Sequence, residues 1–198
     1  QVTQDAENLP AKAALAGYGA VLRERSALAA ELFGTQASLG APVHARSSTP
    51  ILAGDCVGRD CIRVGDAAMA VDPLSGNGIF QSLSSALQAP MVINTLLRRP
   101  GRAGLARQFH QQRVAELFMR FARTGRDFYA QEQARSGQPF WGRRQGWPDT
   151  QPLHLAADNQ AVQVVRRPVL CDGLVEEAEI GRASCRDRVS IPVGAASC

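Results

Sequence analysis

The sequence contains almost no lysine. Lys12 is the one lysine among the 22 lysine and arginine residues of this 198-residue chain. The formal net charge is only +4, and the arginines are scattered along the chain rather than interleaved with aromatic residues. Because a nucleic-acid site needs a concentrated basic patch, we expect no nucleic-acid partner.

Long apolar runs and metal-binding patterns are also missing. No apolar run approaches the roughly 20 residues that a membrane-spanning helix needs, and the first residues do not form a signal peptide. We therefore expect no membrane partner and a cytoplasmic location. The five cysteines match neither a zinc motif nor a C-x-x-C pair, and the three histidines are dispersed. Free thiols and no metal site are expected.

The most informative pattern lies in residues 61–97. It opens with Cys61-Ile62-Arg63-Val64, a short run that predicts a buried strand ending at a turn. From Gly78 onward, apolar residues recur at helical spacing and predict an amphipathic helix. These residues are Ile79, Leu83, Ala86, Leu87, Ile93 and Leu97.

A glycine-rich loop separates the expected strand from the expected helix. Its sequence is Asp72-Pro73-Leu74-Ser75-Gly76-Asn77-Gly78. Glycine lacks a Cβ, so such a loop lets its backbone approach a ligand closely. A strand, an acid at its end (Asp66), a glycine-rich loop and a helix N-terminus together form a common nucleotide-cofactor site. The same arrangement can also be a purely structural crossover.

The amino-acid sequences of the turn at Asp66 and of the glycine-rich loop favour the cofactor site. Gly65-Asp66-Ala67-Ala68, followed by residues 72–79, resembles the second FAD fingerprint of the flavin-dependent monooxygenase and halogenase superfamily, which includes para-hydroxybenzoate hydroxylase. The DPLS-x-x-GI wording is most similar to the tryptophan-halogenase-like branch and to flavoproteins that modify peptidyl tryptophan or other aromatic rings. The resemblance is strong over residues 47–97 and vague outside them.

This resemblance implies roles for individual residues. It places the Asp66 carboxylate on ribityl or ribose hydroxyls of FAD, with Gly65 and Ala67 near the pyrophosphate. Pro73 lies beside the reactive edge of the flavin ring, and the N–H groups of Gly78 and Ile79 face its N1 and C2 carbonyl. In halogenases the positions matching Asn77 and Gly78 also line the halide site. The implied cofactor-binding set is Gly65, Asp66, Ala67, Pro73, Ser75, Gly76, Asn77, Gly78 and Ile79, with no catalytic residue assigned.

The implied activity is that of an FAD-dependent oxidoreductase. It uses reduced flavin and oxygen to hydroxylate or otherwise oxidise an aromatic or similarly electron-rich substrate, either a small molecule or a peptidyl side chain. NAD(P)H or a separate flavin reductase supplies the electrons. A flavin-dependent halogenase is one alternative, and a non-catalytic FAD-binding maturation or structural module is another.

The implied fold is α/β. It is an incomplete Rossmann-like FAD domain of the glutathione-reductase type, with long carboxyl-terminal helices and a remnant of a substrate domain. A strand followed by G-x-G-x-x-G is missing, so we expect a carboxyl-terminal fragment. We expect a substrate-domain remnant at 1–45, the FAD domain at 46–135 and an aromatic extension at 136–178. Residues 179–198 resemble translated sequencing adaptor and are expected to be artefactual.

Local patterns complete the expectations. A helix is predicted from Pro10 to a cap at Gly34, and a strand over residues 41–53. His44 and Arg46 on that strand either meet a substrate or belong to a surface strand pair. Pro90 predicts a kink or break, and residues 98–101 predict a stop. A second long helix follows, ending near residues 136–137. Its aromatic stripe is expected in the core, and Trp141 and Trp147 either cap an aromatic substrate or anchor their loop.

Overall fold

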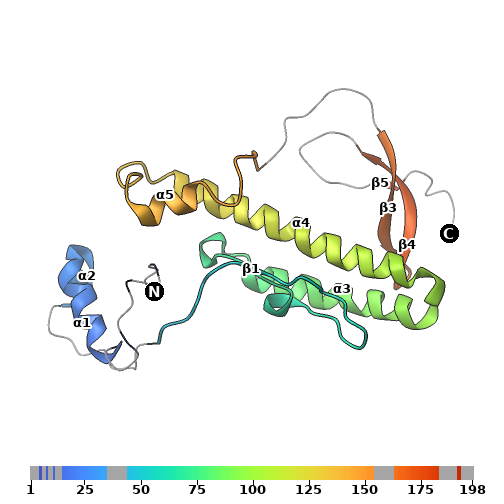
Figure 1. Cartoon of the computed structure of the whole chain (residues 1–198), viewed down its shortest axis with the longest axis horizontal. Helices are drawn as coiled ribbons and strands as arrows, with labels where there is room; N and C mark the ends of the chain where they lie inside the picture. The colour runs from blue at the N-terminus through green and yellow to red at the C-terminus, as the bar shows by residue number, and fades with distance from the viewer. Residues whose placement is uncertain are drawn as a thin grey trace. The chain divides into compact units, whose positions relative to one another are not determined.

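The chain forms two compact units, Gln1–Ser48 and Thr49–Cys198, and each is described here by itself (Figure 1). The computed structural model describes residues 5, 8, 11, 15–34, 44–153, 163–182 and 191–192. Helices and strands both occur, so the fold is mixed, as expected. No helix in these described ranges is long and apolar enough to cross a membrane.

The first unit contains two short helices, α1 (Leu15–Arg25) and α2 (Ala27–Phe33). The prediction of one continuous helix is wrong, because Ser26 adopts an extended conformation and caps α2 by accepting the N–H of Ala29 at 3.2 Å. The predicted cap at Gly34 is confirmed, with φ +70° and its N–H donated to the carbonyl of Ala30 at 2.9 Å. Pro10 and Lys12 lie outside the described residues.

Two long helices dominate the second unit. They are α3 (Gly78–Arg98) and α4 (Ala103–Ala130), joined by the short 3-10 helix η5 (Pro100–Arg102), and they lie side by side (Figure 1). The predicted stop after α3 is confirmed. Of the kink or break predicted at Pro90, the break is wrong, because α3 continues through the proline while Ala89 and Val92 on either side are buried. Packing on both sides of the proline outweighs the one backbone hydrogen bond that it removes.

The apolar residues predicted for α3 lie on its exposed side. Ile79 is 80% exposed and Leu87 is 74% exposed, and Leu83 and Leu97 are also exposed. The side that packs against the rest of the unit carries smaller and more polar residues. These are Gln81, Ser85, Ala89, Val92 and Thr95.

The aromatic stripe of α4 lies mostly in the core, as predicted. Phe118 and Phe121 are buried in a cluster with Cys56, Met69 and Val114. Phe128, near the end of the helix, is exposed. The helix ends at Ala130, earlier than predicted.

The predicted strand over residues 61–64 is wrong. Ile62 makes only an isolated antiparallel bridge with Val57. Its backbone pairs with the preceding turn: the N–H of Arg63 donates to the carbonyl of Cys56 at 2.8 Å, and the N–H of Gly58 donates to the carbonyl of Cys61 at 2.9 Å. From α4, His110 contacts the carbonyl of Arg63 at 2.8 Å. These hydrogen bonds only close one short loop, which is less than the ladder of backbone hydrogen bonds that a strand needs.

The upstream strand is also shorter than predicted. In the described part of residues 41–53, only β1 (Ile51–Leu52) is extended and paired, and its antiparallel partner is β2 (Met69–Ala70). All strand pairs in the described ranges are antiparallel. The parallel sheet of a Rossmann-like domain is therefore not among the residues that the structure describes.

Sequence reasoning missed a β-hairpin near the carboxyl end. It consists of β3 (Gln163–Cys171) and β4 (Leu174–Arg182), with β5 (Ile191–Pro192) beside β4. Asp172 and Gly173 both have positive φ, 48° and 72°, as a two-residue hairpin turn of type I′ requires. The Asp-Gly pair between two β-rich runs was the available signal. β4 runs on to Arg182, into the segment expected to be artefactual.

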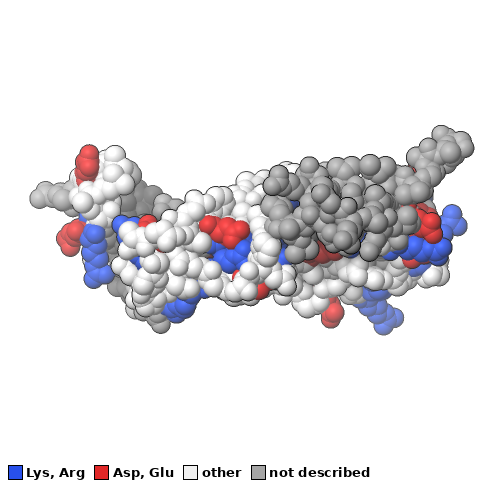
Figure 2. Space-filling view, turned by 90° about the horizontal axis from the view of Figure 1, so that it is seen from above, with Lys and Arg blue, Asp and Glu red and all other residues white. Residues whose placement is uncertain are grey.

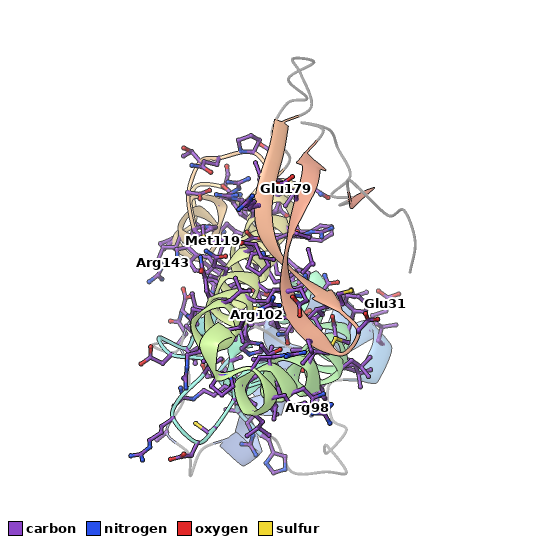
Figure 3. The ribbon with its side chains drawn as sticks, turned by 90° about the vertical axis from the view of Figure 1, so that its right-hand side faces the viewer. Glu31, Arg98, Arg102, Met119, Arg143 and Glu179 are labelled. Carbon is purple, nitrogen blue, oxygen red and sulfur yellow. The ribbon has the colours of Figure 1, made fainter. Side chains whose placement is uncertain are left out.

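The hairpin docks on both long helices. The hydroxyl of Thr95 on α3 accepts the buried N–H of Val175 at 2.7 Å. Val175 is buried with Val92 and Ala106 in a second apolar cluster. Arg102, labelled in Figure 3, forms an ion pair with Glu176 at the rim of this contact.

Candidate functional site

The two segments of the fingerprint meet on the first half of α3. Residues Gly65–Ala67 form the 3-10 helix η3, and Pro73–Ser75 form η4 just before α3 begins. Gly65 is buried with φ +55°, and a Cβ placed on it would lie 3.0 Å from Oγ of Ser82. Its N–H donates to Oγ of Ser85 at 2.9 Å. Only glycine fits this position without strain, so η3 is held tightly against α3.

The Asp66 carboxylate is the free acid of this region. Asp66 lies in the turn of η3 and is exposed. Within the described residues, its side chain has no hydrogen bond or ion pair. It is therefore available to accept hydrogen bonds from hydroxyl groups of a ligand.

The glycine-rich loop is tightly turned by its own side chains. Asp72 accepts the N–H of Leu74 at 2.9 Å, which starts η4 at Pro73. Gly76 ends η4 in the left-handed region at φ +66°. The Asn77 amide donates to the carbonyl of Ser75 at 2.5 Å. These contacts bring the chain to the first turn of α3 in a defined conformation.

The N-terminus of α3 carries donors that its cap residue does not use. Asn77 makes no side-chain hydrogen bond to the first N–H groups of the helix, which include those of Gly78 and Ile79. Nε2 of Gln81 is buried and has no partner among the described residues. Gln81 shares the η3-facing side of α3 with Ser85, one turn further on. Free N–H groups and the positive end of the helix dipole suit an anionic or strongly polar group.

Tyr129 is the residue of this region that sequence reasoning missed. Its hydroxyl donates to Oδ2 of Asp72 at 3.0 Å. Burial and the neighbouring Asp72 carboxylate raise the pKa of Tyr129 to about 12. The available signal was its position on the buried face of α4, since a buried tyrosine hydroxyl needs a partner.

Both tryptophans pack edge-on against aromatic rings of α4. Trp141 lies in α5 (Pro139–Gln145), and its ring centroid is 5.8 Å from that of Tyr129. Trp147 lies 6.0 Å from Phe118. The predicted loop is thus a short helix followed by a turn, and these contacts are those of the anchoring alternative. His44 and Arg46 belong to the first unit, so their expected role beside a substrate stays a prediction.

Charged side chains do not gather in one basic patch on the face shown in Figure 2, where described arginines and acids are interspersed. Arg123 and Arg126 both bind Asp149 and hold the segment after α5 on α4. These arginines are therefore engaged within the fold.

Fold and site together define a mixed helical and stranded protein whose glycine-rich loop and helix N-terminus suit a polar or anionic cofactor. No protein-family model matches the chain, and a search of curated proteins found no relative. A solved structure does match, with 73% sequence identity and a TM-score of 0.81 over 91% of this chain. It is described as "Peptidyl tryptophan dihydroxylase QhpG essential for tryptophylquinone cofactor biogenesis". The chain spans 42% of the length of that structure.

This similarity corrects the expected family branch. The chain was expected to be a carboxyl-terminal fragment of an FAD-dependent monooxygenase or tryptophan-halogenase-like flavoprotein, and the similar structure is a dihydroxylase. The halogenase-like assignment is therefore wrong. The match also gives no support to the predictions that the chain is a carboxyl-terminal fragment and that residues 179–198 are artefactual. The expected reaction agrees with the similar enzyme, which is a dihydroxylase of peptidyl tryptophan and so hydroxylates an aromatic side chain.

Proposed function

We propose that this chain provides the flavin-facing loop and helix of an FAD-dependent oxidoreductase that hydroxylates a peptidyl tryptophan. The observation that carries the proposal is the 73% identity to a peptidyl tryptophan dihydroxylase over 91% of the chain. Such identity over a contiguous fold supports the same reaction class. The geometry at the start of α3 supports a flavin as the group that the loop holds.

The residues on the first half of α3 fit a flavin. The free carboxylate of Asp66 is suited to ribityl or ribose hydroxyls. Of the two residues assigned to the pyrophosphate, Ala67 is exposed, whereas Gly65 has its N–H taken by Ser85 and would contribute only the close packing of η3 on α3. The first N–H groups of α3, at Gly78 and Ile79, would face the polar edge of the ring. The buried Nε2 of Gln81, which has no partner in the described residues, is a further donor on this side of the helix. A buried donor without an acceptor costs about 1–3 kcal/mol, so a ligand acceptor there would be favoured.

The remaining residues of the glycine-rich loop would shape the flavin site and carry no charge. Pro73 starts η4 and would stand beside the reactive edge of the ring. Ser75, Gly76 and Asn77 form the turn that leads into the helix and keep side chains away from that edge. A bound FAD would supply the redox chemistry with oxygen, and the helix dipole would stabilise negative charge on its ring. NAD(P)H or a flavin reductase as electron source, and a cytoplasmic location, stay predictions.

The first test is flavin binding by the 198-residue chain. Addition of FAD is expected to quench flavin fluorescence with saturable binding. Asp66→Ala removes an acceptor of ligand hydroxyls and is expected to weaken binding about tenfold or more, since hydrogen bonds to charged groups contribute about 1.5–3 kcal/mol. Asp60→Ala is the matched control, because Asp60 is also an exposed acid and lies in the preceding turn. Absence of FAD binding to the unsubstituted chain would overturn the flavin assignment.

The second test is the reaction itself. A tryptophan-containing peptide, incubated with the protein, FAD, a reductant and oxygen, is expected to gain the mass of two oxygen atoms on its tryptophan. A peptide with phenylalanine in place of tryptophan is the control. Flavin binding without any oxygen transfer to the peptide would favour a non-catalytic flavin-binding module instead.

A further inference from the structure

We propose that Tyr129 is a positioning residue that holds the glycine-rich loop in its ligand-binding conformation through Asp72. The inference rests on the proposed function, because that function assigns residues 73–79 to the flavin. Tyr129 itself is in the last turns of α4, at a position 57 residues from Asp72 in the chain. The flavin fingerprint covers neither Tyr129 nor any other residue of α4.

The Asp72 carboxylate makes one hydrogen bond to the glycine-rich loop and one to α4. One oxygen accepts the N–H of Leu74 at 2.9 Å and so shapes the first turn of η4. The other oxygen accepts the hydroxyl of Tyr129 at 3.0 Å. Any rotation of the Asp72 side chain that breaks one hydrogen bond also disturbs the other. The tyrosine hydroxyl thereby fixes the Asp72 side chain, and the Asp72 side chain fixes the backbone that leads into Pro73.

The Tyr129 ring is itself held in place. It is 7% exposed, and its edges meet Phe140 at 6.1 Å and Trp141 at 5.8 Å between ring centroids. The amide of Gln145 donates to the Tyr129 carbonyl at 3.1 Å, which ties α5 to this turn of α4. A buried phenol with aromatic neighbours has little freedom to reorient. Through Tyr129, the glycine-rich loop is therefore attached to a tightly packed part of the fold.

Two further observations support the assignment. Gly125 lies one turn before Tyr129, and a Cβ on it would lie 3.9 Å from Cβ of Asp72, so the loop runs close to the α4 surface. The raised pKa of Tyr129, about 12, keeps its hydroxyl protonated and donating over the whole physiological range. The Tyr129 hydroxyl is therefore able to donate to Asp72 throughout this range.

Hydrogen exchange on the protein without flavin tests the positioning directly. Tyr129→Phe keeps the ring and deletes the hydroxyl, which donates to Asp72 and also interacts with Arg144. We expect amide exchange over residues 73–79 to become about tenfold faster. Exchange at Val175, on the docked hairpin, should not change, which distinguishes a local effect from general loss of stability. Tyr18→Phe is the matched control, since Tyr18 lies in the other unit. Unchanged exchange over residues 73–79 would overturn the proposal.

Flavin affinity provides the second readout and separates this proposal from the proposed function. With FAD as the probe, Tyr129→Phe is expected to weaken binding about fivefold, with a shifted flavin absorption spectrum. If the unsubstituted chain binds FAD and the variant binds it equally well with the same spectrum, the positioning proposal fails while the flavin assignment stands. If neither binds FAD but exchange over residues 73–79 still increases, the flavin assignment fails and Tyr129 is a loop anchor only, which also overturns its ligand-positioning role.

Discussion

The buried N–H of Gly65 donates to the hydroxyl of Ser85 at 2.9 Å, and this hydrogen bond joins the first segment of the fingerprint to α3. The Ser85 hydroxyl in turn donates to the carbonyl of Ser82 within the helix. A small polar side chain at this position lets η3 approach the helix backbone. The fingerprint therefore depends on the shape of α3 as well as on its own glycines.

Gly65→Ala is expected to lower the free energy of unfolding by about 1–3 kcal/mol. The positive φ costs an alanine roughly 1–2 kcal/mol, and the new methyl group would contact Oγ of Ser82 at about 3.0 Å. Urea unfolding followed by circular dichroism measures the change. Gly104→Ala in α4 is the control: nothing lies within 4 Å of its added Cβ, so helix propensity should leave it neutral or up to about 1 kcal/mol more stable. Equal effects at the two positions would contradict this explanation.

Thr95→Val is expected to loosen the hairpin from α3. The valine keeps the shape of the threonine but removes the acceptor of the buried Val175 N–H, at an expected cost of about 1–3 kcal/mol. Hydrogen exchange at Val175 and urea unfolding both measure this loss of stability. Thr124→Val is the matched control, because among the described residues the Thr124 hydroxyl bonds only to the carbonyl of Arg120 in its own helix. A loss at position 124 as large as at 95 would mean that helix propensity, not docking, is responsible.

Alkaline pH is expected to destabilise the protein through Tyr129. Its folded pKa of about 12 lies above the ordinary value of 10, so the folded state favours the protonated phenol. The contribution is complete below pH 10 and is lost as the pH rises from 10 to 12, by about 2 kcal/mol. The buried Cys56 thiol, whose pKa burial also raises, adds to the alkaline loss in the unsubstituted protein and the variant alike. The unfolding free energy of Tyr129→Phe should depend less on pH in this window, and an unchanged dependence would contradict the assignment.

The exposed side of α3 is expected to tolerate polar substitution. Leu87→Ser should change the unfolding free energy by less than about 0.5 kcal/mol, because the leucine is already in solvent. Val92→Ala, on the buried side of the same helix, should cost about 1.5–3 kcal/mol. The two variants are compared by urea unfolding. A large loss from Leu87→Ser would show that its side chain is covered in solution.

Several parts of the fold could be predicted because the responsible residues are neighbours in the chain. The positive-φ cap at Gly34 and the stop of α3 before Pro100 follow from local backbone geometry. Positive φ at Gly65 and Gly76 likewise matches the glycines of the two expected turns. The hairpin turn at Asp172 and Gly173 carried an equally local signal, which was overlooked.

The sequence by itself determined the two long helices, the cap at Gly34 and the fingerprint that indicates a flavin, since these depend on contacts within a few residues. Only the tertiary structure decided which side of α3 is buried, because its packed side is lined by small and polar residues such as Ser85 and Thr95 rather than by the apolar stripe. It also decided that residues 61–64 contact α4 instead of forming a strand, and that Tyr129 reaches Asp72. Each of these outcomes depends on partners tens of residues away, which no local pattern specifies.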